Sequence, residues 1–385
     1  MEHNNTHDAL LYLCTLTILH TFFLCMHTTD FDYHLPPERI AQKSIEPRDH
    51  SRLMVIQRDS HVVEHRHFYD VVEYFTSGDV VVWNNSKVFK ARLTGRLESS
   101  DRDINQDGVP DRALLHQREV EIFLVRPMQN QGVWKVLGKP GRRIVPGMIV
   151  RFAPDFYCEV MVKEKNGTIL VQFPDTEDEV RRKANQYGSI PIPPYVKDEV
   201  HALESYQTVY ARPEGSVAAP TAGFHFTPEL IERLKAKGVV FAEVTLHVGL
   251  GTFLPVKAER VEDHTMHSEW VEISGETANI ITRARHEGQR IIAVGTTTVR
   301  TLEGVASLHQ GEIVPYRGDI NIFITPGFQF RIVDALITNF HLPKSTLLML
   351  VSAFVGDREF VLDCYRTAVE EQYRFYSFGD AMFIS

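Results

Sequence analysis

The sequence predicts an α/β fold, in which an α/β domain carries an inserted small β-barrel domain. From Asp79 to about Phe173, short apolar segments alternate with turn signals and show no helical periodicity, as in a barrel. After Pro191, strand-like and helix-like segments alternate, which is typical of an α/β domain. We therefore expect residues 26–78 and 176–385 to form the α/β domain and residues 79–175 to form the barrel.

The expected barrel strands are segments rich in β-branched and aromatic residues. Lys139-Pro-Gly, Val145-Pro-Gly and Lys165-Asn-Gly mark turns between them. The expected strands are Val80–Trp83, Ala91–Arg96, Val120–Val125, Val133–Leu137, Met148–Phe152, Glu159–Glu164 and Thr168–Phe173.

The segment from Asp103 to Asp111 alternates acidic residues around Gly108, as a calcium loop does. The flanking helices and the distal glutamate of an EF-hand are missing, so a polar hairpin insertion is the interpretation that we prefer.

In the α/β part, the helix expected over 228–237 has the clearest boundaries. Thr227 suits the N-cap, Pro228 the first helical position and Gly238 the C-terminal end. The remaining expected elements are a strand over 239–248, a helix over 276–287, a strand over 290–294, a helix over 299–308, a strand over 332–337, and helices over 345–354 and 358–372.

The net charge of −9 over 385 residues excludes a generally basic nucleic-acid-binding protein. A polyanion would have to bind local basic stretches, and two such stretches contain no acidic residue. A solvated strand face is the alternative interpretation of each. The two stretches contain Lys87, Lys90, Arg92 and Arg96, and Lys139, Arg142, Arg143 and Arg151.

The cysteines Cys14, Cys25, Cys158 and Cys364 show no C-x-x-C spacing. This distribution argues against a disulfide framework or a thiolate zinc site, and it fits a reducing cytoplasm.

The apolar stretch over 9–26 could be a signal peptide or a membrane anchor. No Lys or Arg precedes it and no small-residue cleavage site follows it, and a signal peptide needs both. We expect translation to begin at Met26 and residues 1–25 to be absent from the native protein, which would then have no membrane segment.

Two histidines are expected to lie near the ends of sheet strands. His225 precedes the helix over 228–237, and His247 ends the strand that follows it. In open α/β sheets, ligands bind at the edge where parallel strands end. Gly249 and Gly251 follow His247 but lack the third glycine of a dinucleotide fingerprint, so they could simply form a tight turn. Either histidine could likewise be structural.

Further polar motifs fall at strand-to-helix junctions. Gly295-Thr296-Thr297-Thr298 begins a helix, where free amides and hydroxyls suit a carboxylate or phosphate, and Arg300 could add a bidentate contact. N-capping is the alternative role of these threonines. Asn339 and His341 occupy a second junction.

His264-Thr-Met-His267 stands close to Glu269. Zinc binding is one interpretation, but no third ligand is evident, and we prefer a role in positioning substrate or in proton transfer.

Together these motifs resemble the S-adenosylmethionine:tRNA ribosyltransferase-isomerase family of queuosine biosynthesis. The resemblance extends from Asp30 to the C-terminus. The matching segments include Ala219-Pro-Thr-Ala-Gly-Phe-His-Phe-Thr, Thr245-Leu-His-Val-Gly-Leu-Gly-Thr-Phe, Val294-Gly-Thr-Thr-Thr-Val-Arg-Thr-Leu-Glu, Thr338-Asn-Phe-His-Leu-Pro-Lys-Ser, Glu46-Pro-Arg-Asp-His-Ser-Arg-Leu and Tyr373-Arg-Phe-Tyr-Ser-Phe-Gly-Asp-Ala-Met.

The resemblance implies an α/β domain with an inserted barrel and an unusual use of S-adenosylmethionine. The ribosyl part, rather than the methyl group, goes to 7-aminomethyl-7-deazaguanine at the wobble position of a tRNA. The products are epoxyqueuosine-tRNA, adenine and methionine. S-adenosylmethionine is a co-substrate, and no metal is implied. We expect a cytoplasmic monomer that binds the anticodon arm of tRNA. The alternatives are an S-adenosylmethionine-dependent RNA methyltransferase and a non-enzymatic RNA-binding module.

This chemistry needs a base at the 5′-carbon next to the sulfonium, a proton donor for the departing adenine, and a neutral attacking amine. Histidine suits each role near neutral pH. The candidate catalytic residues are His225, His247, His267 and His341, with Glu269 and Asp380 as orienting carboxylates. The candidate co-substrate-binding residues are Thr221, Gly223, Gly249, Gly251, Thr296, Thr297 and Arg300. The candidate tRNA-binding residues are Lys87, Arg92, Arg142 and Arg143.

Overall fold

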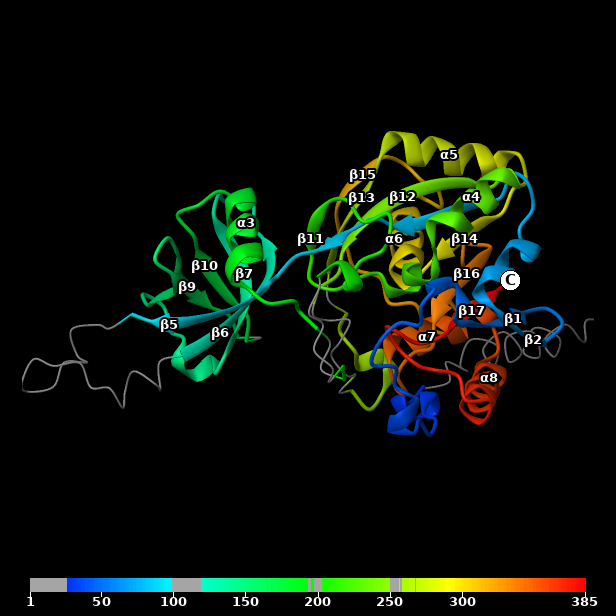
Figure 1. Cartoon of the computed structure of the whole chain (residues 1–385), viewed down its shortest axis with the longest axis horizontal. Coiled ribbons are helices and arrows are strands. Elements are labelled where there is room, and N and C mark those ends of the chain that lie inside the picture. The colour runs from blue at the N-terminus through cyan, green and yellow to red at the C-terminus, as the bar shows by residue number, and fades with distance from the viewer. Residues whose placement is uncertain are drawn as a thin grey trace, which may run out of the picture.

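The computed structural model describes residues 26–98, 119–165, 167–192, 195–196, 203–249, 256, 258–266 and 268–385. The described chain forms a large mixed sheet covered by helices and a separate closed barrel (Figure 1). The calcium-loop motif over 103–111, His267, Gly251 and residues 1–25 lie outside the described residues.

Within the described residues, nine strands form the large sheet. Their order across the sheet is β15 (Tyr316–Ile320), β13 (Glu269–Ile273), β12 (Val240–His247), β3 (Val80–Asn84), β14 (Ile291–Val294), β16 (Ala335–Asn339), β17 (Ala381–Ile384), β1 (Arg52–Gln57) and β2 (Val62–His67). The central strands β12, β3, β14 and β16 are parallel. The outer pairs β12–β13, β13–β15, β16–β17 and β1–β2 are antiparallel, while β1 and β17 are parallel.

The central strands are buried on both faces because helices cover both sides of the sheet. Every residue of β3, β14 and β16 is buried, as expected for parallel strands between two helical layers. Successive side chains of β3 point to opposite faces. Val80 and Val82 join one core cluster, whereas Val81 and Trp83 join another.

The helices divide between these two faces. The face of Val82 is covered by α5 (Gly275–His286), α6 (Thr296–Leu308), α7 (Thr346–Val355) and α8 (Arg358–Glu370). The face of Val81 is covered by α4 (Pro228–Ala236) and by the 3-10 helix η4 (Phe68–Tyr74). Thr227 caps α4 through the amide of Leu230, as its sequence predicts. In contrast, α6 begins three residues before the expected position, at Thr296.

The barrel closes in the order β10 (Ile169–Gln172), β7 (Val133–Lys139), β6 (Glu119–Pro127), β5 (Arg92–Leu97), β8 (Ile149–Ala153) and β9 (Phe156–Lys163). The helix α3 (Glu177–Tyr187) adds Val180 and Ala184 to the barrel core. Between the two bodies, β4 (Lys87–Val88) pairs in parallel with β11 (Glu214–Ser216). The other 3-10 helices are η1 (Thr28–Phe31), η2 (Pro37–Arg39), η3 (Arg48–His50), η5 (Gly141–Arg143), η6 (Leu203–Tyr206), η7 (Thr221–His225) and η9 (Val261–Asp263).

The barrel boundaries differ from those expected at 79 and 175. The expected first barrel strand, Val80–Trp83, belongs to β3 in the centre of the large sheet. Its apolar run is that of a strand buried on both faces, while β5 alternates buried and more exposed residues. At the other end, α3 packs on the barrel although it lies beyond residue 175. The packing therefore assigns β3 to the sheet and α3 to the barrel.

Among the described helices, none has both the length and the apolar character that crossing a bilayer requires.

Candidate active site

One edge of the large sheet brings together strand ends from distant parts of the chain. The parallel strands β12, β3, β14 and β16 have their carboxyl ends there. Because β17 and β13 run antiparallel to their neighbours β16 and β12, and β1 runs with β17, these three strands begin at the same edge. This is where ligands bind in open α/β sheets. The residues at these strand ends are Ser51, Asn84, His247, Glu269, Gly295, Asn339 and Asp380.

His225 is held at this edge by hydrogen bonds to both nitrogens of its ring. It ends η7, and Ser51 Oγ lies 2.7 Å from its Nδ1. The amide Nδ2 of Asn339 donates to Nε2 over 3.1 Å, and the Thr221 hydroxyl donates to Oδ1 of the same amide over 3.3 Å. The ring of Phe68 packs on the imidazole with a centroid distance of 5.0 Å. The side chains of Ser51, His225 and Asn339 therefore form a hydrogen-bonded row, which holds the imidazole ring in one orientation.

The charge state of His225 follows from its surroundings. Burial, and then the nearby positive charges of Arg374 and Arg48, lower the pKa of His225 to about 3 from its ordinary value of 6.5. The imidazole is therefore neutral at pH 7. In this state it is a weak base, and it is not a source of a proton.

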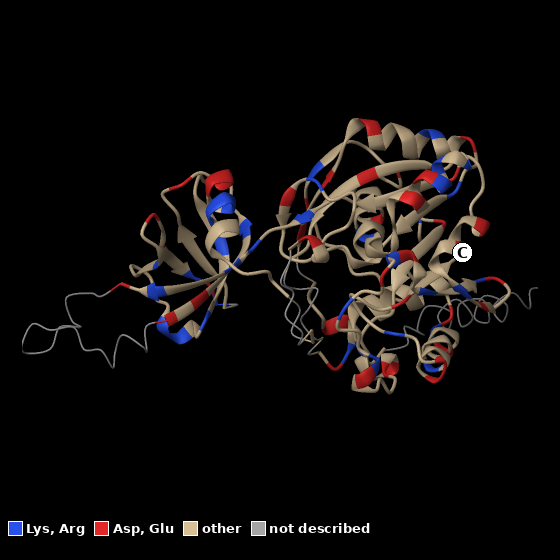
Figure 2. Cartoon of the chain, in the orientation of Figure 1, with Lys and Arg blue, Asp and Glu red and all other residues tan. Residues whose placement is uncertain are grey.

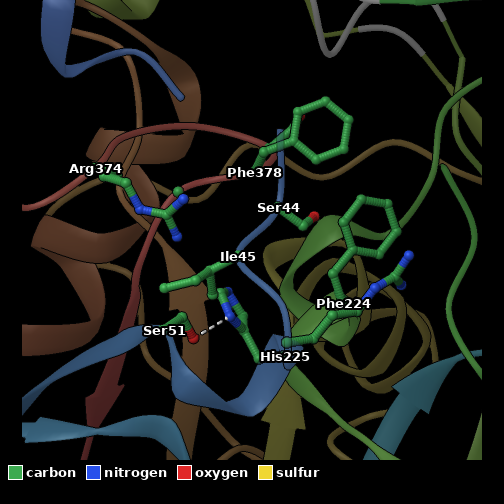
Figure 3. Close-up of a pocket in the computed structure, with 10 residues that line it drawn as sticks. Ser44, Ile45, Ser51, Phe224, His225, Arg374 and Phe378 are labelled. Atoms are coloured by element: carbon green, nitrogen blue, oxygen red, sulfur yellow. Dashed lines mark hydrogen bonds between the residues drawn. The ribbon is translucent and has the colours of Figure 1, made fainter. Parts of the chain in front are cut away.

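A small cavity opens beside this row (Figure 3). Its lining includes Ser44, Ile45, Arg48, Ser51, Phe224, His225, Arg374 and Phe378, and its volume is about 10 Å³. A cavity of this size holds about one water molecule. In this structure the cavity therefore has room for a small terminal group and not for a whole co-substrate.

Asp380 orients an arginine rather than a histidine. Its carboxylate accepts hydrogen bonds from the backbone amides of Arg52 and Arg374, at 3.1 and 2.8 Å. It also lies 3.3 Å from Nη2 of Arg374, whose side chain lines the cavity. Asp380 itself is 2 % exposed. Asp380 thus fixes the direction of the Arg374 side chain.

His341 follows the end of β16 by two residues and is buried. Its Nε2 lies 2.9 Å from the Thr338 hydroxyl, and its backbone is held by the hydroxyls of Tyr33 and Tyr365. Burial lowers the pKa of His341 to about 3, so this ring is neutral as well. It does not line the cavity beside His225. These contacts describe a histidine that fixes the junction after β16.

His247 lies at the same edge as His225 but not beside it. The ends of β12 and β16 are three strand spacings apart, or about 14 Å. The ring of His247 stacks on Trp270 at 5.0 Å, and a side chain at Gly215 would overlap it. Burial, then the charge of Arg181, lower the pKa of His247 to about 4. Its Nδ1 is buried and has no hydrogen-bond partner within the described part of the chain.

Glu269 and Arg300 form an ion pair with each other. The Nε of Arg300 donates to Oε2 of Glu269 over 2.9 Å, and Nη2 lies 2.8 Å from the same oxygen without hydrogen-bond alignment. The third nitrogen, Nη1, donates to the carbonyl of Ile322 over 2.7 Å. Both side chains are buried. The carboxylate that Arg300 holds in this structure is thus the protein's own.

The threonines at the start of α6 have different environments. The helix begins after Gly295, whose φ of 87° suits glycine, and no side chain caps it. Thr296 is buried, and the buried hydroxyl of Thr297 has no partner among the described residues. The hydroxyl of Thr298 donates to the carbonyl of Val294 instead of capping the helix. Capping therefore does not account for these hydroxyls.

The two described glycines of the expected co-substrate site have contrasting surroundings. A side chain at Gly223 would overlap the hydroxyl of Tyr210, so this glycine allows close packing within the protein. No atom of the described residues lies within 4 Å of a Cβ built at Gly249, and residues 250–255, which follow it, are outside the described part of the chain.

Comparison with known proteins identifies the family. A family model described as queuosine biosynthesis protein matches residues 28–384. S-adenosylmethionine:tRNA ribosyltransferase-isomerase of Thermotoga maritima is 49% identical over 93% of this chain and all of its own length. The protein of that name from Carboxydothermus hydrogenoformans is 50% identical, with the same coverage. The chain belongs to the queuosine biosynthesis protein family.

A solved structure agrees with this assignment. The crystal structure of S-adenosylmethionine tRNA ribosyltransferase from Thermotoga maritima is 40% identical to this chain. It covers 92% of this chain and 100% of its own, with a TM-score of 0.52. The α/β fold with an additional barrel is thus shared with a member of the queuosine biosynthesis family.

The expected tRNA-binding residues lie on and beside the barrel, where basic and acidic side chains are interspersed (Figure 2). Lys87 pairs with Glu214 at 3.0 Å, and Arg92 lies 3.6 Å from Glu121. Both cations are partly exposed. Arg142 is exposed on η5, next to the more buried Arg143.

Sequence reasoning did not select five polar residues of the cavity as site residues. Ser51 and Arg48 lie in the family motif that begins at Glu46, and Arg374 and Ser377 lie in the motif that begins at Tyr373. Ser44 precedes the first of these motifs and carries no separate signal. The two motifs were visible in the sequence, but nothing in their spacing shows that they meet across the end of the sheet.

The described residues contain no group of three or more His, Cys, Asp or Glu side chains that could hold a metal ion.

Proposed function

We propose that this protein transfers and isomerises the ribosyl moiety of S-adenosylmethionine. The acceptor is 7-aminomethyl-7-deazaguanine at the wobble position of a tRNA, and the products are epoxyqueuosine-tRNA, adenine and methionine. The observation that carries the proposal is the match to this family over residues 28–384, with relatives aligned over their full length. The cavity beside a neutral His225 supports it, because the chemistry needs a proton acceptor at the co-substrate.

In this proposal His225 accepts the 5′ proton through Ser51. Both ring nitrogens are already hydrogen-bonded, so the ring does not meet the substrate directly. The relay uses the tautomer with the ring proton on Nε2, in which the turned Asn339 amide accepts from Nε2–H through its oxygen and Nδ1 is unprotonated. Nδ1 then accepts the Ser51 proton while Ser51 Oγ takes the proton of the substrate, which leaves a cationic imidazole. The Thr221 hydroxyl can donate or accept, so it satisfies either orientation of the amide.

The departing adenine needs a proton donor, and none of the three described candidate histidines is protonated at pH 7. A cationic imidazole among them is therefore not the donor that we propose. His247 is our candidate for accepting a second proton, because it lies at the same edge of the sheet and its buried Nδ1 has no hydrogen-bond partner among the described residues.

Product analysis tests the reaction. S-adenosylmethionine labelled in its adenine ring is incubated with tRNA that carries the deazaguanine precursor. Free adenine, formed only when this tRNA is present, is the expected product. Formation of S-adenosylhomocysteine without adenine would contradict the proposal and indicate a methyltransferase.

We also propose a cytoplasmic monomer that binds the anticodon arm through the barrel. The free cysteines Cys158 and Cys364 are compatible with a reducing compartment. Light scattering of the purified protein tests the assembly state, and a dimer would overturn that part of the proposal.

A further inference from the structure

The cavity beside His225 has two features that the proposed proton transfer does not use. One is the pair of guanidinium groups of Arg48 and Arg374, which come from opposite ends of the chain and both line it. The other is the hydroxyl of Ser44. Its oxygen is buried and has no hydrogen-bond partner among the described residues. A buried polar atom without a partner costs free energy, so it points to a ligand that completes it.

The positive charge of Arg48 is only weakly neutralised by the protein. Its Nη1 and Nη2 donate to the carbonyls of Gln207 and Ser205 over 2.7 and 3.0 Å, and these partners are uncharged. The nearest carboxylate, Glu46, lies 3.7 Å from Nε and is largely exposed. The guanidinium also lies over the ring of Phe224, at 5.2 Å. Arg48 is thus fixed in place while its charge remains available.

Arg374 is held in one orientation by a carboxylate of the protein. Asp380 holds both its backbone amide and its Nη2, so the side chain has a defined direction. Figure 3 shows its guanidinium on the side of the cavity opposite Phe224, with Ser44 between them. Each arginine has one carboxylate near it, but Glu46 is largely exposed and Asp380 also accepts from two backbone amides. The cavity between the two guanidinium groups therefore favours an anionic group.

The shape of the cavity indicates which kind of anion fits. Ser51 and His225 form its inner part and are 1 % and 4 % exposed, and the aromatic rings of Phe224 and Phe378 form a wall. A phosphodiester of RNA has a ribose on each side and therefore suits an open groove. A carboxylate ends its chain and can enter a closed space. The apolar wall is also suited to the methylene groups that precede a carboxylate.

We infer that Arg48, Arg374 and Ser44 form the subsite for the α-carboxylate of S-adenosylmethionine. This inference rests on the proposed function for the identity of the co-substrate. It places the amino-acid end of that molecule next to Ser51 and His225. A bound carboxylate also offsets the two arginine charges that, after burial, hold down the pKa of His225, so binding makes this histidine a stronger base.

The test compares S-adenosylmethionine with its decarboxylated analogue, which lacks only the carboxylate. The wild-type protein should prefer S-adenosylmethionine at least about 100-fold in kcat/KM, since each charge-assisted hydrogen bond contributes about tenfold or more. In Arg374→Gln the preference should fall below about tenfold. Arg366→Gln is the matched control, because Arg366 is an exposed arginine on α8 paired with Asp363. An unchanged preference in Arg374→Gln would overturn the inference.

Ser44→Ala provides a second variant in case Arg374→Gln does not fold. Removing an unpartnered hydroxyl should leave the free energy of unfolding unchanged or raise it, while the affinity for S-adenosylmethionine falls several-fold. Full affinity in this variant would count against the subsite. Calorimetric binding of both compounds separates the subsite from the reaction. If wild type binds S-adenosylmethionine with the expected preference but releases no adenine, the proposed function fails and the carboxylate subsite stands.

tRNA binding distinguishes the other source of an anion. If the arginines contact a backbone phosphate, Arg374→Gln should weaken tRNA binding and reduce its salt dependence, with the preference between the two compounds unchanged. That result would also overturn the carboxylate assignment.

Discussion

Removing the Ser51 hydroxyl separates a chemical role of the Ser51–His225 pair from a structural one. Ser51 is buried, and its oxygen lies 2.7 Å from Nδ1 of His225. Ser51→Ala deletes this hydrogen bond and leaves a buried ring nitrogen without a partner, which costs about 1–3 kcal/mol of unfolding free energy. Native proteins are commonly stable by about 5–15 kcal/mol, so the variant should still fold.

The effect on turnover should be much larger than the effect on folding. A positioned proton acceptor contributes about 10²- to 10⁴-fold, and kcat for adenine release should fall by that factor while tRNA affinity is unchanged. Single-turnover adenine release and urea unfolding are measured on the same preparations. Ser60→Ala is the control, since Ser60 is an exposed serine bonded to Gln57. Turnover of Ser51→Ala within about fivefold of wild type would refute the relay through this hydroxyl.

Three further predictions concern neighbouring residues. Glu269→Gln should destabilise the fold by about 3–5 kcal/mol in urea unfolding, because it leaves the buried charge of Arg300 without its anionic partner. The KM for S-adenosylmethionine should be unchanged. Gly223→Ala should lower the unfolding free energy by about 1–3 kcal/mol through overpacking, whereas Gly249→Ala should alter it by less than about 0.5 kcal/mol; equal losses would contradict this. Burial lowers the pKa of His341 to about 3, so below its ordinary pKa of 6.5 only the unfolded chain takes up this proton. The free energy of unfolding is therefore highest above pH 6.5 and falls toward pH 3 by about 1.4 kcal/mol per pH unit. Unfolding curves at pH 7 and pH 5 should show this contribution in the wild type, and His341→Asn should lack it.

Local sequence patterns were sufficient for most elements of the fold. Thr227 and Pro228 mark the start of α4, where the threonine hydroxyl accepts from the amide of Leu230. The strand Val80–Trp83 lies in the large sheet and not in the barrel that its sequence predicts, because a short apolar run does not distinguish a barrel strand from a strand buried on both faces. Its partners, β12 and β14, lie more than a hundred residues further along the chain.

The sheet edge of the site was also predictable, but the contacts at that edge were not. His225 and His247 follow from the rule that ligands bind where parallel strands end. Ser51 is 174 residues from His225, and Asn339 is 114 residues from it. Only the strand order β16-β17-β1 brings these segments side by side. Spacing within a motif carries no information about that order.

Arg300 and Arg374 show why the burial and the existing partners of an arginine must be known before a ligand is assigned to it. Arg300 stands one turn into a helix at the correct edge, which from the sequence favours anion binding. Glu269, 31 residues away, is buried with it and already neutralises it. A ligand carboxylate at Arg300 would have to displace this partner and leave it buried and unpaired, at a cost of several kcal/mol. At Arg374 the carboxylate of Asp380 also accepts from two backbone amides, and the guanidinium faces a cavity. A ligand there adds to the existing contacts without breaking them, so Arg374 is the stronger candidate for an incoming anion.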